Sequence, residues 1–278
     1  MKNIKKVLAV VLALTLTLAF CTACGGGSDE SAEADKTIKV AATPAPHAEI
    51  LEDVVKDILA EDGWDLEVVV MEDYVTPNTA VTDGDVDANY FQHINYLDSY
   101  NEENGTDIVN AGGVHYEPMG VYKGTKKSFE ELAEGDQIGV PNDPTNEARA
   151  LNLLAENGVI TLKEDAGVTA TVLDIVDNPK GVEIVELEAA TLPTQLPGLA
   201  LGVINGNYAI EAGLALKDTI ASETSESELI AEQYVNIIAC AKGNEESDKI
   251  VALVKALKSD AVKKYIEDNY EGAVQSMF

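Results

Sequence analysis

The stretch TIKVAATPAPHAEILEDVVKDILAEDGWDLEVVVME (37–72) decides the fold of this chain. Residues 37–42 are rich in β-forming side chains, and residues 65–72 repeat that character. Between them, residues 48–62 place apolar side chains at helical spacing, and Gly63 ends the helix. The order strand–helix–strand favours a parallel sheet with a right-handed crossover.

The same alternation continues toward the C-terminus. Ser128 and Glu131 have the spacing of a capping box and predict a short helix. Further strands are expected at 137–140, 199–204 and 234–241, with a helix at 146–157 that Gly158 ends. The sequence therefore predicts an α/β protein of two lobes.

Two extended runs, 115–123 and 232–241, are candidates for the chain crossing between the lobes. The predicted division places residues 37–117 plus 234–278 in lobe 1 and residues 118–233 in lobe 2. Ligand sites in such folds lie beyond the carboxyl ends of strands, in the crevice between lobes.

The N-terminus has the pattern of an exported protein. Lys2, Lys5 and Lys6 precede an apolar run of signal-peptide length at 7–20, and small residues precede Cys24. Residues 1–23 are predicted to be a cleaved signal peptide, and Cys24 a lipidated cysteine. Residues 24–36 are predicted to form the anchor and a flexible tether. Two alternatives stay open: lipidation at Cys21, or an ordinary secretory signal.

The charge balance excludes one class of partner. The chain has a formal net charge of −30, and loss of residues 1–23, which carry three lysines and no acid, makes it −33. A surface this acidic repels phosphate backbones, so nucleic-acid binding is not expected.

An enzymatic function is not expected either. His47, His93 and His115 are scattered in sequence without metal-ligand spacing, so neither a metal nor a cofactor is predicted. A GxSxG elbow, a P-loop and a dinucleotide fingerprint are missing from the sequence. Cys240 lies in an apolar run and is expected to be a buried side chain without a catalytic role.

Arg149 is the only arginine among 19 basic residues. A guanidinium offers paired donors that match a carboxylate, which lysine does poorly. The predicted helix places Arg149 in its first turn, where free backbone N–H groups also favour an anion. Arg149 is therefore the leading candidate to bind a ligand carboxylate, and the alternative is an internal ion pair with an acidic residue.

Three further clusters combine aromatic and amide side chains, and they lie at 73–78, 88–93 and 205–208. Asparagine can donate and accept at once, which suits both charged groups of a zwitterion. Aromatic rings beside it could enclose an apolar side chain. Each cluster taken alone is also compatible with core packing or a simple turn.

At these residues the chain resembles the methionine-binding lipoproteins of ABC importers, the MetQ/NlpA family. The similar segments are ATPAPHAEILE (42–52), DYVTPN (73–78), GDVDANYFQHINYLD (84–98), YEPMGVY (116–122), IGVPNDPTNEARAL (138–151), TVLDIVDNPKGVEIVELEAATLP (171–193), VINGNYA (203–209) and YVNIIA (234–239). They occur in the family's order over nearly the whole chain after the tether.

The resemblance implies a type II periplasmic-binding-protein fold, in which each lobe is a mixed sheet flanked by helices and the ligand lies in the cleft between lobes. It implies that Arg149 binds the carboxylate of methionine and that Asn205, with Asn207 beside it, binds the amino-acid backbone. The thioether pocket would be lined by Tyr74, Phe91, His93 and Tyr116.

The resemblance also implies that the protein is anchored by lipid on the extracytoplasmic face of the cell membrane and delivers its ligand to an ABC permease with an ATPase subunit. Two alternatives remain. The ligand could be another small apolar amino acid or a methionine-containing dipeptide, or the protein could serve a cell-envelope interaction without transport.

Overall fold

A computed structural model describes residues 35–224 and 233–278 of the chain. Residues Lys36–Phe278 form one compact unit. The predicted signal peptide, the lipidated Cys24 and nearly all of the tether lie outside the described residues, as does the segment 225–232.

The strand–helix–strand prediction is confirmed. Strand β1 (Thr37–Ala42) pairs in parallel with β2 (Asp65–Val70), and the register joins Thr37 to Asp65. The connection between them is extended at Ala45 (φ −126°, ψ 144°) and helical from Pro46 to Glu61. Its helical part includes the end of the Pro44–Ala48 segment, a π-helical turn at Leu51–Val55 and α1 (Lys56–Glu61). The helix begins two residues earlier than the sequence predicts, with Pro46 in its first turn, where no backbone N–H is needed.

The first lobe is built on a mixed six-stranded sheet of order β13-β4-β12-β3-β1-β2. Its remaining strands are β3 (Ala88–His93), β4 (Val109–Tyr116), β12 (Val235–Cys240) and β13 (Gln275–Ser276). Strands β1, β2 and β3 run parallel, and β12 is antiparallel to both β3 and β4.

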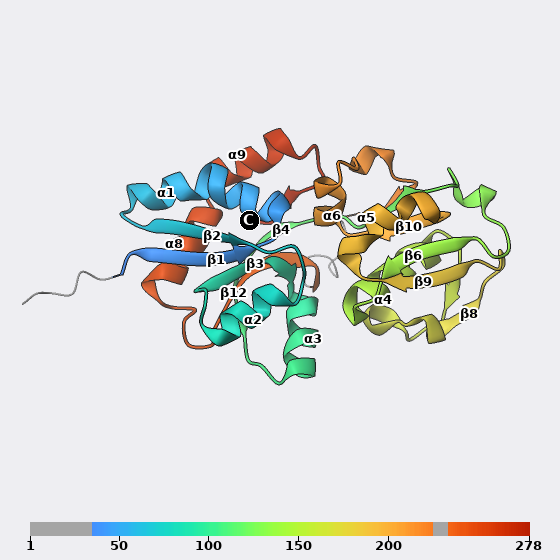
Figure 1. Cartoon of the computed structure of the whole chain (residues 1–278), viewed down its shortest axis with the longest axis horizontal. Helices are drawn as coiled ribbons and strands as arrows, with labels where there is room; N and C mark the ends of the chain where they lie inside the picture. The colour runs from blue at the N-terminus through green and yellow to red at the C-terminus, as the bar shows by residue number, and fades with distance from the viewer. Residues whose placement is uncertain (1–34, 225–232) are drawn as a thin grey trace, which may run out of the picture. The chain divides into compact units, whose positions relative to one another are not determined.

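Helices cover both faces of this sheet (Figure 1). Helices α1, α8 (Asp248–Leu257) and α9 (Asp260–Asn269) pack against one face, and α2 (Thr76–Asp83) and α3 (Ile94–Asn104) against the other. Successive residues of β1 alternate between the two cores: Val40 and Ala42 face the first and Ala41 the second. The second half of β1 is therefore buried on both faces, which explains its apolar sequence Val40-Ala41-Ala42.

The second lobe is built on a mixed five-stranded sheet of order β11-β5-β10-β6-β9. Its strands are β5 (Gly120–Lys123), β6 (Gln137–Pro141), β9 (Glu183–Leu187), β10 (Leu201–Ile204) and β11 (Ala221–Ser222). Its helices are α4 (Pro144–Glu156), α5 (Leu192–Gln195) and α6 (Gly206–Glu211), and β7 (Thr161–Leu162) pairs separately with β8 (Ile175–Asp177).

The chain passes from one sheet to the other between β4 and β5, across residues 117–119. It returns between β11 and β12, and part of that return lies outside the described residues. The predicted crossing at 115–123 agrees with the first passage. All of β12 belongs to the first sheet, so the second passage precedes residue 235. The exact lobe boundaries at 117/118 and 233/234 stay predictions.

The predicted capping box at Ser128 is wrong in detail. A short 3₁₀ helix forms at Phe129–Glu131, but the Ser128 side chain makes no capping hydrogen bond to it. Instead, the Glu131 carboxylate accepts a hydrogen bond of 2.8 Å from the Lys127 backbone N–H.

Cys240 is fully buried in the core of the first lobe, as the sequence predicts. Burial raises the pKa of its thiol to about 11. Within the described residues, no helix is both long enough and apolar enough to span a membrane.

Candidate ligand-binding site

A cavity lies between the lobes, beyond the ends of strands β3, β6 and β10. Its lining comes from Tyr74, Phe91, Gln92, His93, Tyr96, Glu117, Asn146, Arg149, Asn205, Gly206, Asn207 and Asn236. Aromatic side chains from the first lobe therefore face amide and guanidinium groups from the second.

Six of the seven predicted ligand-binding residues line this cavity: Tyr74, Phe91, His93, Arg149, Asn205 and Asn207. Tyr116 is not among the lining residues. It is fully buried, and its hydroxyl donates a hydrogen bond of 2.8 Å to Glu223. Tyr116 therefore supports the site through Glu223. For all seven predicted residues, direct contact with a ligand stays a prediction.

The structure places Arg149 in a buried ion pair. Its Nε donates to Glu223 Oε1 at 2.7 Å and its Nη2 to Glu223 Oε2 at 2.6 Å, and Nη2 also donates to the Glu117 carbonyl oxygen. Burial alone would lower the pKa of Arg149, but the Glu223 carboxylate outweighs burial and raises it. The internal ion pair that the sequence left open is therefore present.

The guanidinium is not fully used by this pair. Its Nη1 group makes no hydrogen bond to any residue in 35–224 or 233–278, and Arg149 lines the cavity. The Nη1 group of the only arginine thus stays available for an anion. The paired donors that were expected to bind a ligand, Nε and Nη2, are occupied by Glu223.

The expected position of Arg149 in a first helical turn is wrong. Helix α4 begins at Pro144 and is capped by Asp143, whose side chain accepts from the Asn146 backbone N–H at 3.0 Å. Arg149 lies in the second turn, so free N–H groups of the helix end do not contribute beside it. The Asp-Pro pair at 143–144 is the sequence signal for this earlier start.

Asn205 and Asn207 follow β10 directly and each leaves one polar atom without a partner among the described residues. Asn205 Nδ2 donates to Asn146 Oδ1 at 2.9 Å, whereas its Oδ1 is buried and unpaired. Asn207 Oδ1 accepts from the Tyr74 hydroxyl at 2.5 Å, whereas its Nδ2 is buried and unpaired. Buried polar atoms in proteins are nearly always paired, so an open acceptor and an open donor in one cavity indicate a ligand with both functions.

His93 caps helix α3 and is held as a neutral side chain. Its Nδ1 accepts from the Tyr96 backbone N–H at 3.0 Å, so the proton resides on Nε2, which donates to Asn146 Oδ1 at 3.2 Å. Burial, with the nearby Arg149 charge, lowers the pKa of His93 to about 3. His93 therefore joins the two lobes without adding charge to the cavity.

The aromatic wall centres on Tyr74. Its ring lies 5.8 Å from Phe91, 5.7 Å from Tyr96 and 4.9 Å from Tyr208, measured between ring centroids. The Tyr208 hydroxyl also donates to the Glu72 carbonyl oxygen at 3.1 Å, which is a third hydrogen bond between the lobes, after Tyr74 to Asn207 and His93 to Asn146. These rings form the apolar side of the cavity.

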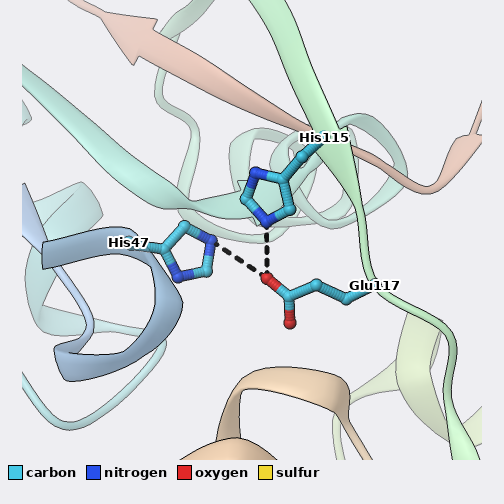
Figure 2. Close-up of side chains that lie close together, drawn as sticks. All are labelled: His47, His115 and Glu117. Atoms are coloured by element: carbon cyan, nitrogen blue, oxygen red, sulfur yellow. Dashed lines mark hydrogen bonds and ion pairs between the residues drawn. The ribbon is translucent and has the colours of Figure 1, made fainter. Parts of the chain in front are cut away.

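The three histidines are scattered in the sequence, but the fold brings two of them together. His47 and His115 both approach the Glu117 carboxylate, at 3.4 Å and 2.7 Å from Oε1 (Figure 2). The ligand atoms of these three side chains lie within 4.8 Å of one another. Residue spacing could not show this cluster, because the fold brings together segments 68 or more residues apart.

Several further cavity residues lie in the segments that resemble the family, although no role was predicted for them. They are Gln92, Tyr96, Glu117, Asn146 and Asn236. The signal was present in part: Asn146 follows the buried strand β6, and Asn236 lies in a strand with an otherwise apolar sequence.

A two-lobed α/β fold with a polar and aromatic cavity between its lobes defines a substrate-binding protein. The chain belongs to the NlpA lipoprotein family, whose family model matches residues 38–278. A relative from Bacillus subtilis (strain 168), the methionine-binding lipoprotein MetQ, is 43% identical over 270 residues, covering 94% of this chain and 96% of the relative.

Solved structures agree with this assignment. A chain from Ruminococcus gnavus ATCC 29149 that is described as a lipoprotein is 59% identical, with a TM-score of 0.85 over 87% of this chain and 100% of the other. A nutrient-binding protein from Burkholderia cenocepacia, solved bound to methionine, is 42% identical, with a TM-score of 0.82 and the same coverage. The chain is thus a binding protein and not an enzyme.

Proposed function

We propose that this protein captures methionine in the interlobe cavity and delivers it to the permease of an ABC importer. The observation that carries the proposal is the pair of unpartnered amide atoms, Asn205 Oδ1 and Asn207 Nδ2, in a cavity that Arg149 also lines. An α-amino acid brings a donor and an acceptor to the same carbon. The names of the relatives from Bacillus subtilis and Burkholderia cenocepacia support methionine as that amino acid.

The geometry supports a defined orientation of the ligand. The carboxylate meets Arg149 Nη1 and Asn207 Nδ2, and the amino group meets Asn205 Oδ1. The thioether then lies toward Tyr74, Phe91 and His93. Contacts between sulfur and aromatic rings are worth about 0.3–1.5 kcal/mol each. Charged hydrogen bonds contribute about 1.5–3 kcal/mol each and supply most of the affinity.

Ligand binding is proposed to stabilise the closed arrangement of the lobes. Three hydrogen bonds already join the lobes around the cavity: Tyr74 to Asn207, His93 to Asn146, and Tyr208 to Glu72. A ligand that contacts both walls adds differential free energy to the closed state and shifts the population toward it.

The location proposed for the protein is the extracytoplasmic face of the cell membrane, with a lipid on Cys24. The relatives are named as lipoproteins, and the small residues before Cys24 support this anchor. Mass spectrometry of the N-terminal peptide from membrane-extracted protein tests it. A lipid found on Cys21, or an unmodified N-terminus, would contradict the assignment.

Calorimetric titration of the chain from Gly25, unfolded and refolded to remove bound ligand, tests the function. We expect micromolar or tighter binding of L-methionine. Asn205→Ala and Asn207→Ala should each weaken it by about 10- to 150-fold, the range of a hydrogen bond to a charged group. Arg149→Lys, which keeps a charge opposite Glu223, should weaken it similarly.

Asn104→Ala, at the far end of α3, is the matched control and should leave affinity unchanged. If another apolar amino acid or a methionine-containing dipeptide binds more tightly than methionine, the ligand assignment is wrong. If nothing binds and Arg149→Ala causes no functional loss in cells, a cell-envelope interaction replaces transport.

A further inference from the structure

Glu117 is a buried carboxylate on the cavity wall. It lies in the segment that joins β4 to β5, only 5% of its surface is exposed, and it contributes to the cavity lining. Its Oε1 atom faces His115 and His47, whose rings approach it from two sides (Figure 2).

The two histidines that face Glu117 carry no charge. His47 Nε2 also faces Asn236 Oδ1 at 3.0 Å, and an amide oxygen only accepts, so the ring proton is on Nε2. Its Nδ1 then accepts from the Thr43 hydroxyl at 2.7 Å. Burial lowers the pKa of His47 to about 4, so it is neutral at physiological pH.

His115 follows the same pattern. Its Nε2 donates to Glu117 Oε1 at 2.7 Å, and its Nδ1 accepts from the Tyr90 hydroxyl. Burial lowers the pKa of His115 to about 3. His115 therefore donates an N–H to the carboxylate and His47 lies beside it, and neither neutral ring adds a positive charge.

The positive charge of Arg149 is already paired with another carboxylate. Arg149 is paired through two hydrogen bonds with Glu223, so one positive charge stands against two carboxylates around the cavity. Among the side chains of 35–224 and 233–278, Glu117 has no lysine or arginine in a salt bridge with it. A buried charge of this kind is costly unless a counter-charge reaches it.

The second carboxylate oxygen is held at the start of α6. A Cβ atom at Gly206 would lie 2.7 Å from Glu117 Cβ and 2.9 Å from Oε2, so only glycine leaves room for the carboxylate there. The Asn207 backbone N–H faces the same carboxylate and partly offsets the rise in its pKa that burial causes. The unpaired Asn205 Oδ1 lies just before this turn and is a second acceptor in the lining of the same cavity.

We propose that Glu117 is the specificity-determining residue that accepts the charged amino group of the ligand, and that the site thereby requires a free amine. The inference rests on the proposed function and deepens it. The ligand's ammonium supplies the missing counter-charge at Glu117 and Asn205 Oδ1, while its carboxylate lies at the Arg149 and Asn207 end.

A metal ion is the competing occupant, because two histidines and a glutamate form a known zinc ligand set. The distances favour the ammonium. The 2.7 Å separation of His115 Nε2 and Glu117 Oε1 is a hydrogen-bond length, and His47 Nε2 already has Asn236 Oδ1 as an acceptor. Both rings therefore hold protons where a metal would need lone pairs.

The experiment compares two ligands in two proteins. L-methionine and 4-(methylthio)butanoate share the thioether and the carboxylate, but only methionine has the amine. Both are titrated by calorimetry into the refolded chain from Gly25, as wild type and as Glu117→Gln. We expect wild type to prefer methionine by about 10- to 150-fold, and Glu117→Gln to lose most of that preference by weakening methionine alone.

Glu147→Gln is the matched control, since Glu147 is equally buried but lies outside the cavity and accepts from the Val172 backbone N–H. A preference retained in Glu117→Gln, or equal weakening of both ligands, overturns the inference. If Glu117→Gln does not fold, N-methyl and N-acetyl methionine are compared on wild type. Tight binding of the uncharged N-acetyl form then overturns it.

Two further outcomes are separable. If wild type ignores methionine, the proposed function fails, and Glu117 is then tested with the amino acid that does bind and its des-amino counterpart. If one equivalent of zinc binds wild type, competes with methionine and is lost in Glu117→Gln, the metal replaces the ammonium and the inference is wrong.

Discussion

Two groups of buried amides in this molecule differ in one respect. In the first lobe, Asn78, Asn89 and Gln92 bond to one another: Asn78 Nδ2 to Gln92 Oε1 at 2.9 Å, Asn89 Nδ2 to Asn78 Oδ1 at 2.8 Å, and Gln92 Nε2 to both partners. In the second lobe, Asn205 and Asn207 are equally buried, but each keeps one open polar atom.

Amides whose polar atoms are all paired stabilise the fold, whereas amides with an unpaired polar atom are available to bind a ligand. A closed network rigidifies the lobe, and opening it leaves several groups unpaired. An open amide already bears the cost of an unpaired atom in the empty protein, so its removal costs little stability and much affinity. Burial and residue type alone do not distinguish the two groups.

The largest expected effect comes from breaking the closed network. Asn78→Ala leaves polar atoms of Asn89 and Gln92 without partners, so the free energy of unfolding should fall by about 3 kcal/mol. Urea denaturation measures it. Asn205→Ala should lower the free energy of unfolding by less than about 1 kcal/mol in the same assay. Equal losses in the two variants would remove the distinction.

The three histidines resemble the closed amide network, because every ring nitrogen is hydrogen-bonded. Their contribution to stability can be measured at acid pH. The chain has only three histidines, and in the folded state their pKa values lie near 3 to 4, whereas an unfolded histidine titrates near 6.5. Below pH 6.5 the unfolded chain binds protons that the folded chain does not. Stability should therefore be greatest above pH 6.5 and fall as the pH decreases toward 4.

The slope should be on the order of 1 kcal/mol per pH unit for each histidine. Burial raises the pKa of Glu117 and Asp143, which gain protons in the folded state and flatten the slope at its acid end. His47→Gln keeps a donor and an acceptor but does not titrate, so its slope between pH 6.5 and 5 should be about a third smaller than that of wild type. An unchanged slope would show that His47 is not held neutral.

The smallest effect is expected at the Tyr74 hydroxyl, which bonds to one of the two open amides. Tyr74→Phe keeps the aromatic wall but removes the 2.5 Å hydrogen bond to Asn207 Oδ1. Methionine affinity should fall by about 3- to 10-fold, since a neutral hydrogen bond contributes about 0.5–1.5 kcal/mol. Tyr265→Phe, which loses an exposed hydroxyl contact to Asp53, is the matched control for calorimetry. A loss as large as that of Asn207→Ala would show that the hydroxyl orients the whole amide.

Much of the fold could be predicted from the sequence because its strands and helices differ in period. Residues 37–42 and 65–70 are continuous β-rich runs, and the helix between them has one apolar stripe. Helix starts were predicted less well. Asp143 and Pro144 start α4 two residues before the expected position, which moved Arg149 out of the first turn.

The site could be predicted where a residue type is rare or lies beyond a buried strand. Arg149, Asn205 and Asn207 meet those conditions, and all three line the cavity. The partner of Arg149 could not be predicted, because any of 49 acids could supply it and the choice depends on how β5 and β11 pair. The Glu117 cluster was missed because its members come from separate elements: His47 from the first helix, His115 from the end of β4, and Glu117 from the link between the lobes.

The buried Cys240 gives this protein a built-in reporter of unfolding. The chain from Gly25 contains no other cysteine, and Cys240 lies in β12, the strand paired on both sides at the centre of the first sheet. A thiol reagent can react there only after the sheet opens. The rate of modification therefore measures how often the first lobe unfolds, and its slowing by a ligand measures binding without any label.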